Sequence, residues 1–408
     1  MPEMQILWAA ALFNLLLCFV DTNALRLSPL PVMAAEAAIL AAAFFLPFTR
    51  PGRAPGRFDA LLLLMVISWL FFAILRQQID PKYLRDVAIM PIFVLLGLHS
   101  RTEGFHPRLF WLHMVIVAFA LWEALDVQGF VRVFSIADYF AHTRGSDSQD
   151  WWVDSGLYLS AVRPEARFLF PDLALHRLSS VFLEPVSLGN YVVIATIWLA
   201  GWWRQIPRTM AWVAVAGTLF LLVGSDSRMA TVACLAILAA LPVKRFIPRL
   251  APVFVAPVVI AAMVLAVVLL GLETGLDTFG GRIAHAVELF HDFTLANWAG
   301  LALDKLKAAE DAGFGYLIMV HSLPVAATIW ILLFRRELRT VEGRYMHLAI
   351  AIYVALNLTV SWSIFSIKTA ALLWFMLGRS IREDEEAPEA IAANGASVAQ
   401  RSPLRSAT

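Results

Sequence analysis

The chain has 408 residues, of which 60% are hydrophobic and 15% are charged, and its mean hydropathy is +0.72. These values exclude an ordinary soluble domain, in which about a quarter of the residues are charged. They also exclude a disordered chain, which lacks aliphatic and aromatic residues. The net charge of +1 gives no general attraction for phosphate backbones, so we expect no nucleic-acid partner. The composition indicates a membrane protein.

Twelve apolar segments follow one another along the chain. A helix needs about 20 mostly apolar residues to cross a bilayer. We therefore predict an all-α, polytopic membrane protein with about 12 transmembrane helices in a single domain, residues 1–380. The sequence then becomes charged, and afterwards small and polar, which predicts a disordered cytoplasmic tail over 381–408. The predicted spans are 6–20, 30–48, 58–75, 84–98, 109–130, 185–203, 210–225, 229–243, 250–271, 315–334, 345–361 and 364–378.

Basic residues in short loops predict the orientation, because cytoplasmic loops carry an excess of Arg and Lys. One set of loops is rich in them: residues 49–57, 99–108, 203–208, 244–249 and 335–344. The connections on the opposite side hold fewer, among them Lys82, Arg85 and Lys368. Two long loops, about 131–184 and 272–314, then lie on the periplasmic side. The first carries several arginines against the trend, which suggests a function on that face.

Familiar nucleotide and metal motifs are missing from the sequence. There is no GxxxxGK[ST], HExxH, CxxC or EF-hand pattern, and both cysteines, Cys18 and Cys234, lie in apolar segments. We therefore expect no metal, no nucleotide and no cofactor. A periplasmic active site finds no ATP, so its energy must come from an activated substrate.

The most informative segment, HRLSSVFLEPVSLGNY, stands where the first long loop enters the sixth span. On a helix, Arg177 and Glu184 share one face because they are seven residues apart. Pro185 would break or kink that helix, and exposed backbone at membrane depth is tolerated where it lines a cavity. The segment predicts an anion-binding arginine and a nearby carboxylate at a cavity mouth. The alternative is an interfacial salt bridge with a proline kink.

A second segment, GSDSR at 224–228, is predicted to be a tight turn between two spans on the same face. An unpaired Arg that enters the membrane costs about 2.5 kcal/mol or more. Pairing of Arg228 with Asp226 is one interpretation. The other is a phosphate clamp, because a guanidinium grips phosphate oxygens bidentately.

These segments resemble the O-antigen polymerase and ligase family, in particular the Wzy-type polysaccharide polymerases. That family shows Arg–x–x–small–x–Phe–x–Glu–Pro before a span, then Ser–x–Ser–Arg between close spans, then Asp–small–Gly–aromatic before a late span. The matching residues are Arg177, Ser180, Phe182, Glu184 and Pro185, then Ser225, Ser227 and Arg228, then Asp311, Ala312, Gly313 and Phe314. The resemblance covers roughly 175–378. The ligase branch places a His–Asn pair before the late span, where this chain has Asp311 through Tyr316, and this difference favours a polymerase.

The resemblance implies a glycosyltransferase of the bacterial inner membrane. It would join oligosaccharide repeats, carried on polyprenyl diphosphate, at the periplasmic face. Arg177 and Arg228, and next Arg282, would bind the anionic diphosphates, because arginine stabilises charge on the leaving group. Glu184, and next His321, would be the general base, or Glu184 would orient an arginine.

Further residues are expected to contact the substrate: Arg163, Arg167, Tyr316, Asp311, Trp151 and Trp152. For the arginines the alternative is a solvated loop face, and for the tryptophans it is the aromatic belt of the membrane interface. Expected partners are a flippase and a chain-length regulator. Two alternative functions stay open: a ligase that uses the same donor, and a transporter or flippase of lipid-linked sugars.

Overall fold

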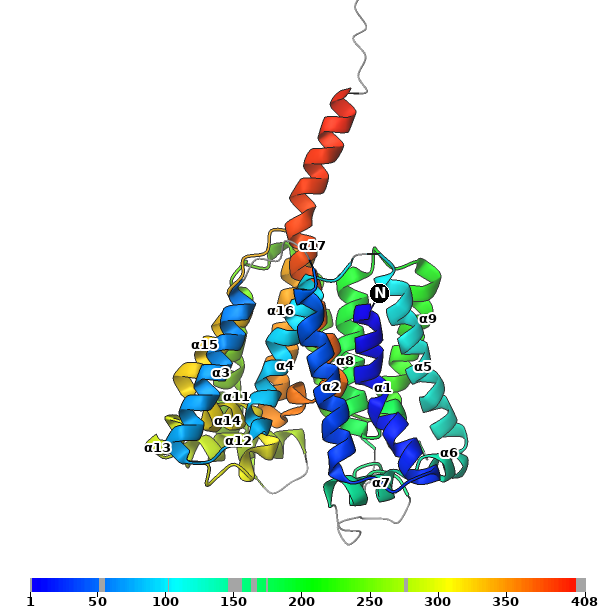
Figure 1. Ribbon diagram of the computed structural model, residues 1–408, viewed down its shortest axis with the longest axis vertical. Helices are drawn as coiled ribbons and strands as arrows, with labels where there is room; N and C mark the ends of the chain where they lie inside the picture. The colour runs from blue at the N-terminus through cyan, green and yellow to red at the C-terminus, as the bar shows by residue number, and fades with distance from the viewer. Residues whose placement is uncertain are drawn as a thin grey trace, which may run out of the picture.

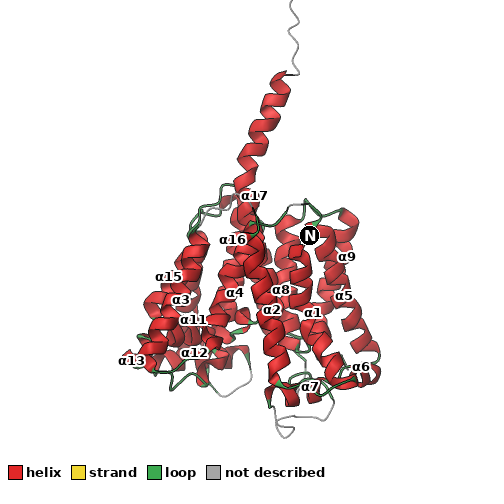
Figure 2. Cartoon of the chain, viewed as in Figure 1, coloured by secondary structure: helices red, strands yellow, loops and turns green. Residues whose placement is uncertain are grey.

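The computed structural model describes residues 2–50, 56–101, 103–145, 156–162, 167–173, 175–274 and 278–400, without the side chains of Glu310 and of 388–400. Within these residues the chain is helical and has no strand (Figure 2). The elements are α1 Pro2–Asn23, α2 Pro29–Phe48, α3 Arg57–Arg76, α4 Pro81–Leu98, α5 Phe105–Leu125, α6 Val127–Val133, α7 Ile136–Arg144, η2 Ser180–Phe182, α8 Pro185–Trp202, α9 Arg208–Ser225, α10 Arg228–Ala239, η3 Lys244–Phe246, α11 Ala251–Leu270, α12 Phe279–His291, α13 Leu295–Trp298, η4 Ala308–Asp311, α14 Gly313–His321, α15 Leu323–Phe334, α16 Val341–Val360, η5 Ser363–Phe365 and α17 Ile367–Gln400, where η marks a 3₁₀ helix.

Several of these helices are suited to a bilayer. Among the described helices, seven are long and apolar enough to cross a membrane, and the bent pair α14–α15 makes an eighth if it forms one span. The helices α2 and α11 are strongly apolar, yet few of their side chains are buried. Lipid solvates such faces, whereas water does not. The apolar helices therefore suggest a membrane-embedded protein.

The bundle has two distinct ends. Figure 1 shows α6, α7, α12 and α13 at one end, which we call the loop end. The N-terminus lies at the opposite end, where α17 also leaves the bundle, and we call this the tail end. Both long loops of the sequence contribute short helices to the loop end, namely α6 and α7 from the first and α12, α13 and η4 from the second.

The helices α4 and α17 pack closely in the middle of the bundle. A side chain added at Gly97 of α4 would overlap the carbonyl oxygen of Phe375, and one added at Gly378 of α17 would overlap that of Val94. Glycines at both positions let the two backbones approach, as small residues commonly do between membrane helices. This crossing fixes α4 relative to α17, and both helices carry charged residues to the loop end.

One predicted span is broken. The segment 315–334 was expected to be one helix, but α14 and α15 meet at 113°. Ser322 has a φ of 69°, and Pro324 lies in the first turn of α15, so the helix cannot continue through this point. The Arg76 guanidinium caps the end of α14 by donating to the carbonyls of Met319 and Val320 at 2.7 and 2.8 Å.

A disordered tail over 381–408 stays a prediction, and the structure describes α17 as far as Gln400. Its acidic residues are held by the bundle. Asp384 accepts hydrogen bonds from the backbone N–H groups of Arg339 and Thr340 at 2.9 and 2.6 Å, just before α16 begins. Glu383 accepts one from the indole of Trp202 at 2.6 Å. These contacts fix the first turns beyond the predicted boundary.

Candidate functional site

A cavity of about 690 Å³ lies at the loop end. Its walls come from α2, α4, α7, α12 and the start of α17, together with the segments before α8 and between α16 and α17. Charged side chains of both signs line it. The cations are Lys82, Arg85, Arg144, Arg282 and Lys368, and the carboxylates are Glu36, Asp86, Glu184 and Asp311. Such a cavity suits an anionic or highly polar ligand.

At one side of the cavity, Arg144, Glu184 and Lys368 form what we call the Glu184 triad. The Lys368 Nζ lies 2.7 Å from one carboxylate oxygen of Glu184, and an Arg144 nitrogen lies 2.7 Å from the other. The Ser187 hydroxyl donates to the carboxylate at 2.7 Å. The Arg144 guanidinium also rests 4.3 Å above the centre of the Phe140 ring. Three elements, α7, α8 and α17, thus meet at one carboxylate.

The triad keeps Glu184 ionised. Burial alone would raise the pKa of Glu184, but the charges of Lys368 and Arg144 and the hydrogen bonds hold this pKa well below its usual value. A carboxylate that resists protonation is a weak general base. The sequence left two roles open for Glu184, and this geometry favours orienting the cations. Burial, and next the charge of Glu184, raise the pKa of Tyr158 nearby to about 12, so its phenol stays a hydrogen-bond donor.

A second charged group lines the wall formed by α2 and α4. Arg85 lies 2.8 Å from Glu36 and 2.6 Å from Asp86. The Tyr316 hydroxyl donates to the other oxygen of Asp86 at 2.6 Å. Tyr316 was expected to contact substrate, but it is buried behind Asp86 and does not line the cavity. Tyr316 therefore supports the cavity wall from behind, through its hydrogen bond to Asp86.

Two predicted residues of the second long loop do meet at the cavity. Arg282 of α12 lies 3.3 Å from Asp311 of η4, and both side chains line the cavity. Both side chains are partly exposed, so their interaction is screened by water and contributes little stability. Also in the cavity lining, the Lys82 Nζ lies 4.3 Å from the centre of the Trp362 ring. This pair offers an aromatic face beside a positive charge.

The segment before α8 is not helical, contrary to the expectation that Arg177 and Glu184 share one helix face. Within residues 175–184, the 3₁₀ helix η2 is the one regular element, and Ser180 and Leu183 have φ values of 51° and 62°. Pro185 is the first residue of α8 rather than a kink within a helix. The buried Glu123 carboxylate holds the segment by accepting the N–H groups of Ser179 and Ser180. Because the backbone is not helical between them, Arg177 and Glu184 do not share one helix face.

Arg177 connects the loop to α9. Its guanidinium is buried and donates to the carbonyls of Ser225 and Ser160, both at 3.0 Å. Arg177 does not line the cavity, and neither does Arg228, the first residue of α10. The structure thus does not bring these two predicted diphosphate-binding residues to the cavity. Ser160, which Arg177 holds, does line it.

Arg167 and Asp226 belong to the same connection. Arg167 donates to the carbonyl of Leu175 at 2.6 Å. The Asp226 carboxylate accepts the N–H groups of Phe168 and Leu169 at 3.0 and 2.7 Å. Each of these charges pairs with backbone groups of a loop that is only partly buried, and so fixes that loop against the end of α9. We call Glu123, Arg167, Arg177 and Asp226 the loop anchor.

The remaining predicted site residues lie elsewhere. His321 ends α14, is fully buried and has its Nδ1 3.1 Å from the Ser68 hydroxyl, away from the cavity lining. Trp151, Trp152 and Arg163 lie outside the described residues. In the part of the chain that the structure describes, no three His, Cys, Asp or Glu side chains gather as a metal site.

Sequence reasoning missed several cavity residues: Arg144, Lys368, Lys82, Arg85, Glu36 and Trp362. A signal for the cations was present. Lys82, Arg85, Arg144 and Lys368 all lie at the loop end, the side where the short connections hold few Arg and Lys, so each departs from the positive-inside trend. No protein family, curated protein or solved structure matches the chain. This cavity is therefore the structural basis for proposing a function.

Proposed function

We propose that the protein is a polysaccharide polymerase that joins polyprenyl-diphosphate-linked oligosaccharide repeats. One observation carries the proposal, namely a cavity with five cationic side chains at one end of an apolar helical bundle. A polyprenyl diphosphate combines a membrane-soluble chain with a strongly anionic group. The apolar helices suit the chain, and the cationic cavity suits the diphosphate. The motif resemblance of residues 175–378 supports the same substrate class.

The proposal includes a topology. All twelve apolar segments would cross the inner membrane, including α4, α10, α16 and α17. The first of these carries charged residues at its loop end, and α10 has only 12 residues. The basic loops would lie in the cytoplasm and the cavity would open to the periplasm.

The reaction requires stabilisation of the charge on the leaving diphosphate more than it requires a buried base. The acceptor hydroxyl attacks the anomeric carbon of the donor sugar and its proton passes to an oxygen of the departing diphosphate, while the bond from the anomeric carbon to the diphosphate oxygen breaks. The diphosphate leaves with the electron pair. Arg144 and Lys368 are already oriented by Glu184, and groups set in advance stabilise developing charge without reorganisation. We assign Arg282 and Arg85 to binding of the diphosphates.

The test compares two arginines of the first long loop. Arg144→Gln removes a cavity cation, whereas Arg132→Gln changes an exposed side chain of α6 outside the cavity lining. Each variant replaces the native chain in its host, and polyprenyl-linked glycans are extracted, with protein amount checked. Single lipid-linked repeats in Arg144→Gln, with normal polymer in Arg132→Gln, are the expected result.

Other outcomes separate the alternatives. Long polymer that stays on its lipid carrier would identify a ligase. Repeats that a reagent added outside the membrane cannot reach would identify a flippase. Normal polymer in both variants would show that the cavity cation Arg144 is not needed for polymer formation. A flippase and a chain-length regulator stay proposed partners.

A further inference from the structure

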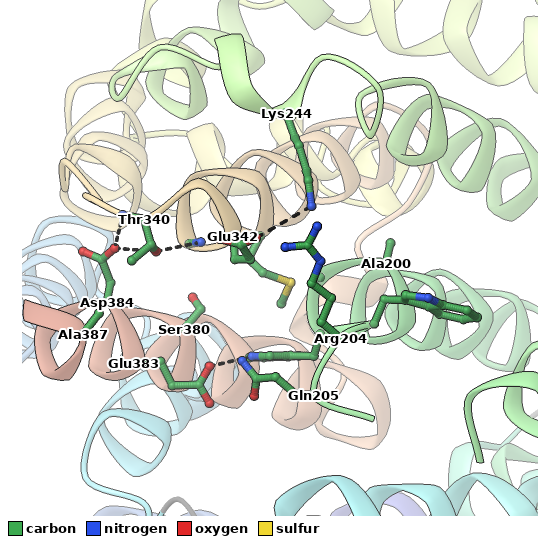
Figure 3. A pocket seen from close by; sticks show the side chains of 15 residues that line it. Ala200, Arg204, Gln205, Lys244, Thr340, Glu342, Ser380, Glu383, Asp384 and Ala387 are labelled. Carbon is green, nitrogen blue, oxygen red and sulfur yellow. Dashed lines mark hydrogen bonds and ion pairs between the residues drawn. The ribbon is translucent and has the colours of Figure 1, made fainter. Parts of the chain in front are cut away.

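A second hollow lies at the tail end, on the opposite side of the bundle from the charged cavity. It has a volume of about 310 Å³ and is enclosed by the end of α8, by η3, by the start of α16 and by α17 (Figure 3). Trp202, Trp203 and Met346 form part of its wall, and Arg204, Lys244 and Glu342 bring charge to it. The proposed polymerase function does not use this hollow.

Two cations face one another across it. Figure 3 shows the side chains of Arg204 and Lys244 pointing toward each other from different elements. Lys244 has only a long contact with a carboxylate, 3.8 Å from Nζ to an oxygen of Glu342. Within the described residues, the Arg204 side chain has no hydrogen bond or ion pair. Like charges that converge in this way are stabilised when an anion lies between them.

The other carboxylates of the hollow are already engaged. Glu383 accepts the indole N–H of Trp202 and forms an ion pair with Arg379. Asp384 accepts the backbone N–H groups that precede α16. Neither of these carboxylates pairs with Arg204 or Lys244 within the described residues, and Glu342 reaches only Lys244. An anion between Arg204 and Lys244 would give both cations a close partner.

We propose that this hollow binds a phosphate group between Arg204 and Lys244. A guanidinium donates in a planar fork that matches two phosphate oxygens, and an ammonium adds a point charge from the other side. Trp203 is exposed beside the hollow and packs edge-on against Trp212, with ring centres 5.4 Å apart. Exposed tryptophans of a membrane protein concentrate at the level of lipid headgroups. The phosphate of a lipid headgroup and a soluble phosphate share this chemistry.

The test uses the purified full chain and two probes. The first is inorganic phosphate in detergent, compared with sodium chloride at equal ionic strength. The second is a nanodisc of phosphatidylglycerol, compared with one of phosphatidylcholine. The variants are Arg204→Gln and Lys244→Gln. Arg245→Gln is the matched control, because Arg245 is the next residue of η3 but is exposed and does not line the hollow. Thermal stability and the affinity for each probe are measured.

We expect both hollow variants to weaken binding by about tenfold or more, since a hydrogen bond to a charged group contributes about that factor. Arg245→Gln should keep the affinity of the native chain. Stabilisation by inorganic phosphate would identify a soluble phosphate ligand, and stabilisation only in phosphatidylglycerol would identify a lipid headgroup. If Arg204→Gln and Lys244→Gln behave like Arg245→Gln with both probes, the hollow is not a phosphate site. Polymer formation plays no part in these measurements, so the two proposals stand or fall separately.

Discussion

Two groups of charges at the loop end use the same residue types for different purposes. In the loop anchor, the Arg177 guanidinium donates to two backbone carbonyls, and the Glu123 carboxylate accepts two backbone N–H groups. In the Glu184 triad, charged side chains meet one another beside a cavity. The anchor satisfies the polar backbone of a buried loop, whereas the triad holds cations where a ligand can reach them. The hydrogen-bond and ion-pair partners of a charged residue near a membrane therefore show whether the residue supports the backbone or faces a ligand.

The largest expected effect is on the anchor. Glu123→Ala would leave the N–H groups of Ser179 and Ser180 buried without an acceptor. Each such group costs about 1–3 kcal/mol, so we expect about 3 kcal/mol or more to be lost from the free energy of unfolding. The measurement is unfolding in a denaturing detergent titration. Asp126→Ala is the control, because it removes another carboxylate that accepts a backbone N–H, that of Gly129, but at the exposed start of α6. Equal losses in both variants would contradict a special role for Glu123.

The next effect concerns the triad and is catalytic. Lys368→Met keeps the length and apolar stem of the side chain but removes the charge beside Glu184. We expect polymer formation per folded molecule to fall by about 100-fold, the effect of losing one preorganised donor at a reacting oxyanion. Removing one partner of a buried ion pair is destabilising, although Arg144 still pairs with Glu184, and polymer is therefore counted per folded molecule. Lys307→Met, at an exposed residue before η4, is the control. Unchanged polymer in Lys368→Met would break the distinction between the two groups.

A third change tests how the cavity is held in place. Gly378→Ala would force α17 away from α4, because the new side chain overlaps the carbonyl of Val94. We expect a loss of about 2 kcal/mol in the free energy of unfolding, typical of overpacking. Gly56→Ala, where an added side chain meets open space apart from Asp59, should cost less than about 1 kcal/mol. A Gly378→Ala variant as stable as Gly56→Ala would show that the helices separate easily.

Arg177→Lys has a smaller expected effect and addresses the original prediction directly. Lysine can reach only part of the fork that joins Ser160 to Ser225, so we expect stability to fall by about 1 kcal/mol. Polymer per folded molecule should stay within about twofold of the native chain. Arg132→Lys, at an exposed position, should change neither quantity. Loss of polymer with normal stability would return Arg177 to the catalytic site.

The smallest effect is a pH dependence. The pKa of Glu184 is lower in the folded chain than in the unfolded one, so its contribution to stability is complete above the unfolded value of about 4.3. That contribution is lost as the pH falls through the folded pKa. The stability difference between the native chain and Glu184→Gln should therefore be widest above about pH 4.3 and shrink in more acidic buffer. Thermal unfolding at several pH values measures it, and a constant difference would refute the depressed pKa.

Hydropathy predicted where the long helices lie. Each predicted apolar segment overlaps a described helix. The break at Ser322 escaped prediction, because the apolar pattern continues across it. The contacts of the acidic residues of α17 escaped it too, since they join residues distant in sequence, as Asp384 and Thr340 do.

The site was predictable in part. Glu184, Arg282 and Asp311 were singled out and line the cavity, whereas Arg177 and Arg228 do not. A motif identifies a charged residue, but its partners depend on how the backbone turns. Arg177 faces the carbonyl oxygens of Ser225 and Ser160, and the buried Glu123 carboxylate holds the neighbouring backbone by accepting the N–H group of Ser179. Neither feature has a signature in the local sequence.

The helix α17 has a consequence for regulation. Lys368 near its start lines the cavity, and Asp384 lines the hollow at the tail end, 16 residues later. At 1.5 Å per residue these positions are about 24 Å apart on one rigid element. If a ligand at either end shifts this helix, thermodynamic linkage makes the coupling reciprocal. Each ligand would then change the affinity for the other by the same factor, so occupation of the hollow would be sensed at the cavity, and occupation of the cavity at the hollow.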